Sequence, residues 1–304
     1  MVPYQPITLD PSAKIFHYGQ SVFEGMKAYK DAKNDIYLFR PLDNWKRLNI
    51  SSKRLAIPEV PESYFMEGLK TLLKLDSEWV QKGEGNALYI RPFVIATENC
   101  VSASSSNKYK FMIICSPVQA YYAGEVRVEI ADKYSRSANG GVGYAKAAGN
   151  YAASFYPAKL AAQQGYQQVL WTDASSHEFL EEAGTMNLFF RIGDKLITAP
   201  TSDSILDGIT RKSLIKISKD LGIDIEVRPI KVNEILNAAN ENNLKEIFGS
   251  GTAVVVLPIS GFGYENEKFE LPSIENPWSL FLKKKLNDIQ YNIIEDPYGW
   301  RVKA

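Results

Sequence analysis

The sequence predicts an α/β protein (α+β type) with two domains and with mixed or antiparallel sheets. Its 304 residues exceed what one hydrophobic core usually organises. Strand-like runs outnumber the helical ones and several follow one another directly, which argues against a parallel sheet with alternating helices. A Gly-Asp pair within "FFRIGDKLITAP" separates two strand-like runs, as in a β-hairpin.

The expected strands are short apolar runs bounded by Gly, Pro, Asn or Ser. They cover residues 36–40, 87–96, 109–118, 126–131, 167–173, 185–192 and 252–259. Helical periodicity is clearest in residues 61–80, where Phe65, Leu69, Leu72 and Leu73 fall on one stripe. Further helices are expected at residues 150–165, 210–221 and 278–290.

The expected domain boundary is the polar, turn-rich stretch "SPVQAYYAGE", residues 116–125. We predict a small N-terminal α/β domain over residues 1–118, an interdomain linker over 119–128 and a large C-terminal domain over 129–304.

Composition excludes several classes of function. The 35 Lys and Arg residues balance the 35 Asp and Glu residues, so no overall field attracts nucleic acid or an anionic membrane. There is no apolar run long enough to cross a bilayer, and the first residues lack the layout of a signal peptide. The two histidines and two cysteines are too few for a His-based metal site or a disulfide framework. We expect a cytoplasmic protein without a metal and without nucleic-acid or membrane partners.

One lysine stands in an unusual setting. Lys146 lies within "GGVGYAKAAGNYAASFYPAK", and no other charged residue occurs between Arg136 and Lys159. Such a lysine can rest its stem on apolar surface and keep its ammonium in water. It can also be partly buried, where desolvation lowers the pKa of the amine and makes it a nucleophile.

A nucleophilic lysine suits a Schiff base with pyridoxal 5'-phosphate (PLP), which makes three further demands. The ring nitrogen needs a carboxylate, and Glu182 precedes an expected strand. The phosphate needs an arginine and backbone N–H groups, which Arg47 and the helix start in "DGITRKS" can supply. The phenolic oxygen needs a donor, and Tyr151 lies five residues after Lys146. Each signal alone is equally typical of a turn or a helix cap.

Six motifs occur together in one order: "HYGQSVFEGMKAY" (17–29), "LYIRP" (88–92), "GGVGYAKAAGNY" (140–151), "EAGTMN" (182–187), "DGITR" (207–211) and "FGSGTA" (248–253). In that order and spacing the sequence closely resembles branched-chain amino acid aminotransferases, of the class IV group of PLP enzymes. The resemblance covers nearly the whole chain. It implies the two-domain class IV fold that D-amino acid aminotransferase also has.

The resemblance implies a role for each matching residue. Lys146 would form the Schiff base with PLP and move the proton between substrate and cofactor. Glu182 would face the ring nitrogen and Tyr151 the phenolic oxygen. The phosphate would be held by Arg47, Ile209, Thr210 and Thr252. The role of Arg136, ten residues before Lys146, stays open.

The same resemblance implies a substrate pocket at Tyr18, Phe23, Tyr89 and Arg91. Alternation in "YIR" places Tyr89 and Arg91 on one face of a strand. Arg91 and Tyr18 would bind the side-chain carboxylate of glutamate or 2-oxoglutarate, and the amides of Thr252 and Ala253 the α-carboxylate. Ordinary core packing is the alternative for Phe23 and Tyr89.

The implied reaction is transamination between L-leucine, L-isoleucine or L-valine and 2-oxoglutarate, giving branched-chain 2-oxo acids and L-glutamate. Two alternatives in the same group are a D-amino acid aminotransferase and an aminodeoxychorismate lyase. A non-catalytic binding protein on this fold is the alternative from another class.

We also expect a homodimer. In the family, the loop that matches "TENCVSASSSNKYKF" (97–111) crosses to the partner subunit, so Val101 and Ala103 would contact the partner's substrate pocket. A solvated surface loop would explain its serines equally well.

Overall fold

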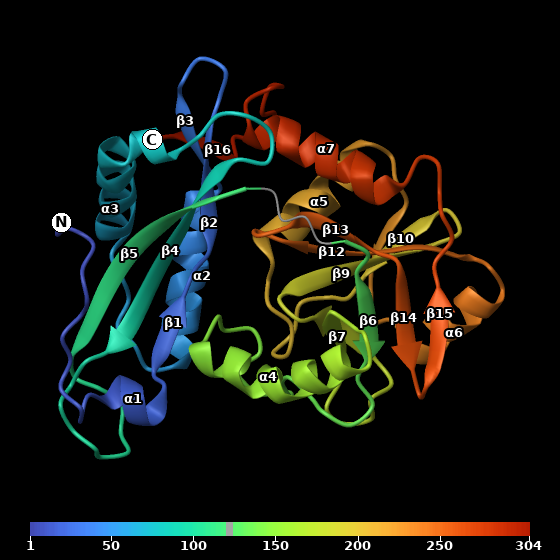
Figure 1. The fold of residues 1–304 in the computed structure, drawn as a ribbon, viewed down its shortest axis with the longest axis horizontal. Coiled ribbons are helices and arrows are strands. Elements are labelled where there is room, and N and C mark those ends of the chain that lie inside the picture. Colours follow the sequence, from blue (N-terminus) through green and yellow to red (C-terminus); the bar gives the residue numbers. More distant parts are fainter. Residues whose placement is uncertain (120–123) are drawn as a thin grey trace.

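The computed structural model describes residues 1–119 and 124–304, which form two sheets side by side (Figure 1). Of the expected linker, residues 120–123 lie outside the described part. Every strand pair in the first sheet is antiparallel, and the order is β1-β4-β2-β3-β16 with β5 on β4. Its strands are β1 (Ser21–Phe23), β2 (Met26–Lys30), β3 (Ile36–Phe39), β4 (Ala87–Ala96), β5 (Tyr109–Val118) and β16 (Arg301–Lys303).

The second sheet is mixed. The pairs β6–β7, β6–β14 and β10–β11 are parallel, and the other pairs are antiparallel. Its strands are β6 (Arg127–Ile130), β7 (Gln168–Thr172), β8 (Leu180–Ala183), β9 (Met186–Ile192), β10 (Lys195–Thr198), β11 (Ile225–Val227), β12 (Leu244–Gly251), β13 (Val255–Ile259), β14 (Gly261–Tyr264) and β15 (Glu267–Glu270). The expected mixed and antiparallel sheets are confirmed. So is the hairpin, in which Gly193 turns from β9 to β10 at φ +55°.

Helices cover both sheets (Figure 1). They are α1 (Lys14–Tyr18), α2 (Pro41–Arg54), α3 (Glu62–Leu75), the 3-10 turn η1 (Ser77–Trp79), α4 (Ala148–Gln163), α5 (Ile209–Asp220), α6 (Val232–Asn240) and α7 (Trp278–Gln290). The prediction of one helix over residues 61–80 was wrong at its end, because the helix stops at Leu75 and a separate 3-10 turn follows. The strand predicted from residue 252 begins only at Val255, because residues 252–254 form the turn that joins β12 to β13.

Apolar packing joins the two sheets. Tyr29 and Phe39 from the first sheet share one buried cluster with Phe189 and Phe248 from the second and with Leu282 of α7. Separate clusters lie under α2 and α3 in the first sheet and beside α6 in the second. The division into domains 1–118 and 129–304 stays a prediction, and β16 returns the chain to the first sheet. In the described residues, no helix is both long and apolar enough to span a membrane.

Candidate active site

Lys146 lies in the loop before α4, at the junction of the two sheets. Its backbone N–H donates to Ser51 Oγ of α2 (2.9 Å), and its carbonyl accepts from the Phe23 N–H of β1 (3.1 Å). Its side chain is held as well: Nζ donates to Tyr151 Oη at 2.8 Å and lies 5.0 Å from the centre of the Phe23 ring. The ammonium is thus fixed between two aromatic residues, which a lysine stem resting on open surface does not explain.

Glu182 on β8 is buried with Arg136 as its ion-pair partner. Only 4% of Glu182 is exposed, and Oε1 lies 2.9 Å from Arg136 Nη2. Oε2 accepts from Asn187 Nδ2 (3.2 Å) and from the Leu206 N–H (3.1 Å). Burial raises the pKa of Glu182 above its ordinary value, although Arg136 opposes this. Arg136, whose role the sequence left open, orients this carboxylate.

The cavity beside Lys146 distinguishes Glu182 from its neighbour Glu181. The walls of this cavity include Glu182, Tyr151, Arg136 and Asn187, whereas Glu181 accepts a hydrogen bond from the Ser204 hydroxyl outside them. Burial raises the pKa of Glu181 too. Glu182 is therefore the carboxylate that a ligand in this cavity would meet.

Arg47 on α2 makes a bidentate ion pair with Glu24. The sequence analysis gave no role to Glu24. Nε and Nη2 of Arg47 lie 2.7 and 2.8 Å from the two Glu24 oxygens, and Asn44 Nδ2 donates to the same carboxylate at 2.7 Å. Burial alone would raise the pKa of Glu24, yet Arg47 and Asn44 bring it below its ordinary value. The sequence held only part of this signal, since Asn44 and Arg47 are one helical turn apart but nothing along the chain links them to Glu24.

The predicted phosphate residues meet at the start of α5. Arg47 Nη1 donates to the Asp207 carbonyl at 3.0 Å, two residues before α5 begins at Ile209. The N-cap residue of α5 has no capping side chain, so the first amides of the helix remain available to an anion. Ile209, Thr210 and Thr252 line a single cavity.

Three of the predicted substrate residues also gather next to Lys146. The Arg91 guanidinium lies 4.6 Å from the centre of the Phe23 ring and donates to Tyr89 Oη at 3.1 Å, so Tyr89 and Arg91 share a face of β4. The Phe23 ring packs 4.9 Å from the Tyr151 ring. The absence of a side chain at Gly25 leaves room for Tyr89, since a Cβ there would come within 2.1 Å of Tyr89 Oη. Within the described residues, the buried Nε of Arg91 lacks a hydrogen-bond partner.

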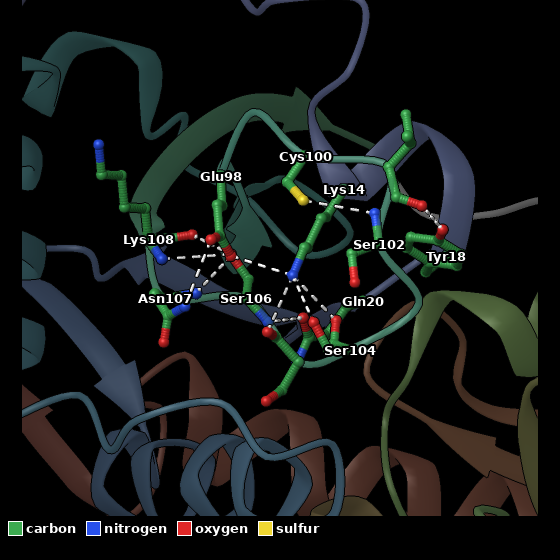
Figure 2. Close-up of polar contacts among 12 residues, drawn as sticks. Lys14, Tyr18, Gln20, Glu98, Cys100, Ser102, Ser104, Ser106, Asn107 and Lys108 are labelled. Carbon is green, nitrogen blue, oxygen red and sulfur yellow. Dashed lines mark hydrogen bonds and ion pairs between the residues drawn. The ribbon is translucent and has the colours of Figure 1, made fainter.

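Val101 and Ala103 lie elsewhere, on the loop between β4 and β5, and Tyr18 is the last residue of α1. Figure 2 shows Tyr18 beside that loop. The Tyr18 hydroxyl donates to the Val101 carbonyl. Val101 is 64% exposed and Ala103 is exposed beside it. In this single chain these residues therefore do not join the group around Lys146.

A buried lysine holds that loop from below. Lys14 is 1% exposed, and its Nζ donates to Ser104 Oγ (2.9 Å) and to the carbonyls of Ser104 (3.2 Å) and Ser105 (3.0 Å). The same Nζ lies 3.0 Å from Glu98 Oε2, as Figure 2 shows. The loop is thus a fixed structure with an exposed apolar tip.

Comparison with known proteins agrees with this arrangement. The sequence profile described as "Amino-transferase class IV" matches residues 21–262. The chain belongs to the class IV aminotransferase family. A "Probable branched-chain-amino-acid aminotransferase" of Staphylococcus epidermidis is 46% identical over all of this chain and 86% of its own length. "Branched-chain-amino-acid aminotransferase 2" of Bacillus subtilis is 41% identical over all of this chain and 85% of its own length.

Solved structures resemble this class IV aminotransferase over almost its whole length. A branched-chain aminotransferase from the thermophilic archaeon Thermoproteus uzoniensis with norvaline has a TM-score of 0.82 and 26% identity, covering 97% of this chain and 94% of that one. Another branched-chain amino acid aminotransferase, solved with pyridoxamine 5'-phosphate, has the same TM-score and identity, covering 99% of this chain and 95% of that one. The expected class IV fold is confirmed.

Proposed function

We propose that this class IV aminotransferase exchanges amino groups between L-leucine, L-isoleucine or L-valine and 2-oxoglutarate, giving branched-chain 2-oxo acids and L-glutamate. The observation that carries the proposal is the position of Lys146, whose Nζ binds Tyr151 at the edge of a cavity that Glu182 also lines. The relatives at 41–46% identity, named for branched-chain amino acids, support the choice of substrate.

The residues present fit PLP as cofactor. Bound PLP supplies an electron sink for the carbanion formed at the substrate Cα. Lys146 offers an amine that no carboxylate neutralises among the described residues, and Glu182 a buried carboxylate opposite it. Arg47 and the start of α5 offer a cation and free amides for a phosphate.

Each side chain then has a definite task. Lys146 would take the proton from the substrate Cα and pass it to the bound cofactor, and the Tyr151 hydroxyl holds its amine in reach. Arg136, Asn187 and the Leu206 N–H hold Glu182 so that it faces the cavity. Glu24 fixes the guanidinium of Arg47, which also donates to the Asp207 carbonyl just before α5.

The substrate side combines apolar walls with one cation. Phe23 and Tyr89 can enclose a branched aliphatic side chain, because apolar walls with a few polar groups suit such a ligand. Arg91, with a buried Nε that has no partner in the described part of the chain, can bind the second carboxylate of glutamate. We assign the α-carboxylate to the amides of Thr252 and Ala253.

A spectroscopic titration tests the proposal. The purified holoenzyme is mixed with L-isoleucine, and separately with D-alanine, while the absorption band of the cofactor is followed. Conversion by L-isoleucine alone is expected. Conversion by D-alanine would instead favour a D-amino acid aminotransferase, and a protein without any coenzyme absorption would be a binding protein on this fold.

We further propose a cytoplasmic homodimer in which Val101 and Ala103 contact the partner's substrate pocket, with Tyr18 hydrogen-bonded to the same loop. The exposed apolar tip of the loop and its fixed base support this arrangement. Solvent-exposed apolar groups on a rigid loop are suited to contact with another surface.

A further inference from the structure

Lys27 on β2 is a buried lysine to which the proposed reaction gives no task. It is 9% exposed, and its Nζ donates to the carbonyl of Ala253 at 2.7 Å. Among the described residues, no carboxylate lies within ion-pair distance of it. Burial, followed by the nearby charge of Lys283, lowers the pKa of Lys27 to about 8. A cation is thus kept inside the protein with a single carbonyl as its hydrogen-bond partner in the described part of the chain.

A second hydrogen bond joins the same two segments in the opposite direction. Thr252 Oγ1 donates to the carbonyl of Gly25 at 3.1 Å. Lys27 lies in β2 of the first sheet and Gly25 directly precedes that strand, whereas Thr252 and Ala253 lie in the turn between β12 and β13 of the second sheet. Two hydrogen bonds, one at Thr252 and one at Ala253, therefore fix the turn to the segment formed by Gly25 and Lys27.

The backbone after the turn shows that it needs to be held. Val255 has φ +61°, a conformation that costs free energy and that β-branched residues very rarely adopt. Its side chain is buried in the core that the two sheets share. Such a conformation persists only where the surroundings impose it. The shared core holds Val255, and the hydrogen bond from Lys27 holds Ala253.

We propose that Lys27 is a positioning residue that fixes the turn at Thr252 and Ala253 so that its amides face the α-carboxylate of the substrate. This inference rests on the proposed function, which assigns the α-carboxylate to those amides. Donors that are already oriented bind an anion without a reorganisation cost, and the ammonium bonded to the turn adds attraction for negative charge.

The test compares a carboxylate with a neutral molecule of the same shape. Dissociation constants of 4-methylpentanoate and 4-methylpentanamide are measured on the PLP-loaded protein by calorimetry. In Lys27→Met we expect the constant for the carboxylate to rise about tenfold, which is about 1.4 kcal/mol. The constant for the amide and the affinity for PLP should stay within about twofold, whereas a general loss of packing would weaken all three.

Two further variants make the result specific. Lys283→Met removes the neighbouring positive charge without touching Ala253, and we expect both constants to stay within about twofold. An equal loss of carboxylate binding in Lys283→Met would overturn the proposal. The positive charge near the turn, and not the hydrogen bond from Lys27 to Ala253, would then be responsible. Lys27→Gln, a polar replacement, is measured in the same way in case Lys27→Met does not fold, with the same selective loss expected.

The experiment separates this inference from the proposed function. A wild-type protein that binds PLP and prefers the carboxylate, together with Lys27 variants that keep that preference, overturns only the role of Lys27. A wild-type protein that does not prefer the carboxylate contradicts the assignment of the turn itself, and with it this proposal.

Discussion

The buried charges around the site come in pairs, and Lys146 is set apart from them. Glu24 faces Arg47 and Glu182 faces Arg136, and both carboxylates accept further hydrogen bonds. In the described part of the chain Lys146 has a phenol as its hydrogen-bond partner, and no carboxylate. Since breaking a buried ion pair is costly, an anionic ligand is best accommodated beside a cation that is not committed to a pair, as Lys146 is not in the described part of the chain.

Replacement of Lys146 by alanine should abolish transamination and leave PLP weakly bound through its phosphate and ring contacts. The physical reason is that the amine of Lys146 is the group placed to move the proton, whereas Arg47 and Glu182 are untouched. Activity and PLP affinity are measured in parallel. Normal turnover by Lys146→Ala would show that another lysine is responsible.

Glu182→Gln should keep the fold and reduce kcat strongly. A neutral amide cannot stabilise a protonated ring nitrogen, and removal of a preorganised electrostatic partner typically costs several kcal/mol of transition-state stabilisation. Steady-state kinetics give the size of the effect, and Glu181→Gln is the matched control with an expected change below about tenfold. A Glu182→Gln enzyme within about twofold of wild type, well under about 1 kcal/mol, would point to another carboxylate.

At the scale of single residues, the sequence predicts those groups whose neighbours along the chain are unusual. Lys146 stands out because small residues surround it, and in the folded chain its amine donates to Tyr151. Glu24 and Asn44 could not be assigned in the same way, because their partner Arg47 comes from another element than Glu24 and only the folded chain brings the three together. The role of Lys27 could not be predicted for the same reason, because its partner Ala253 is distant in the sequence.

Among the elements, α2 escaped prediction because its buried face is largely polar. Asn44, Arg47, Ser51 and Ser52 are buried there beside Leu48, so the apolar stripe that identifies an amphipathic helix is interrupted. The interruption is itself informative, since Asn44 and Arg47 bind Glu24 and Ser51 binds the backbone of Lys146. The strand β12 was missed because "FGSGTA" is dominated by glycine and serine, which are poor strand formers.

The loop that Lys14 holds allows a test of the proposed dimer. Val101→Asp adds a charge to its exposed tip, which should raise KM for isoleucine more than KM for glutamate, because only isoleucine needs an apolar surface there. PLP affinity should not change. KM values for both amino acids and the mass in solution are measured.

Asn99→Asp is the control for that experiment, since it adds the same charge at the exposed base of the loop. We expect it to leave both KM values within about twofold. A fully active monomer would contradict the proposed exchange of loops, as would equal effects of Val101→Asp on both substrates.

Lys27 joins the two sheets of the molecule through its hydrogen bond to Ala253. The free energy of unfolding should therefore depend on whether Lys27 is protonated. The pKa of Lys27 is about 8 in the folded protein, below its ordinary value of 10.5. Between these values the unfolded chain binds more protons than the folded one, so this residue's contribution to the free energy of unfolding increases as pH rises. The increase is at most about 1.4 kcal/mol per pH unit.

Urea unfolding of wild type and Lys27→Met at several pH values between about 7 and 10 measures this effect. We expect the stability of wild type relative to Lys27→Met to increase across that range. A constant difference would contradict a lowered pKa for Lys27. The comparison cancels the other groups that titrate in the same range.

The large-scale fold was predictable in its class and less so in its connections. Runs of strands without intervening helices predicted mixed and antiparallel sheets, and both are present. The return of β16 to the first sheet could not be foreseen, because three residues carry no periodicity and the pairing partner is more than half the chain away.

That return has a consequence for synthesis on the ribosome. After β3 has been synthesised, roughly 260 further residues are added before its neighbour β16 exists. At the usual rate of ~5–20 residues per second this takes about 13–50 s. During that time one edge of the first sheet is open, and an unpaired strand edge can capture another chain. We therefore expect the free side of β3 to be a site of aggregation in the nascent protein until β16 has been synthesised and has paired with it.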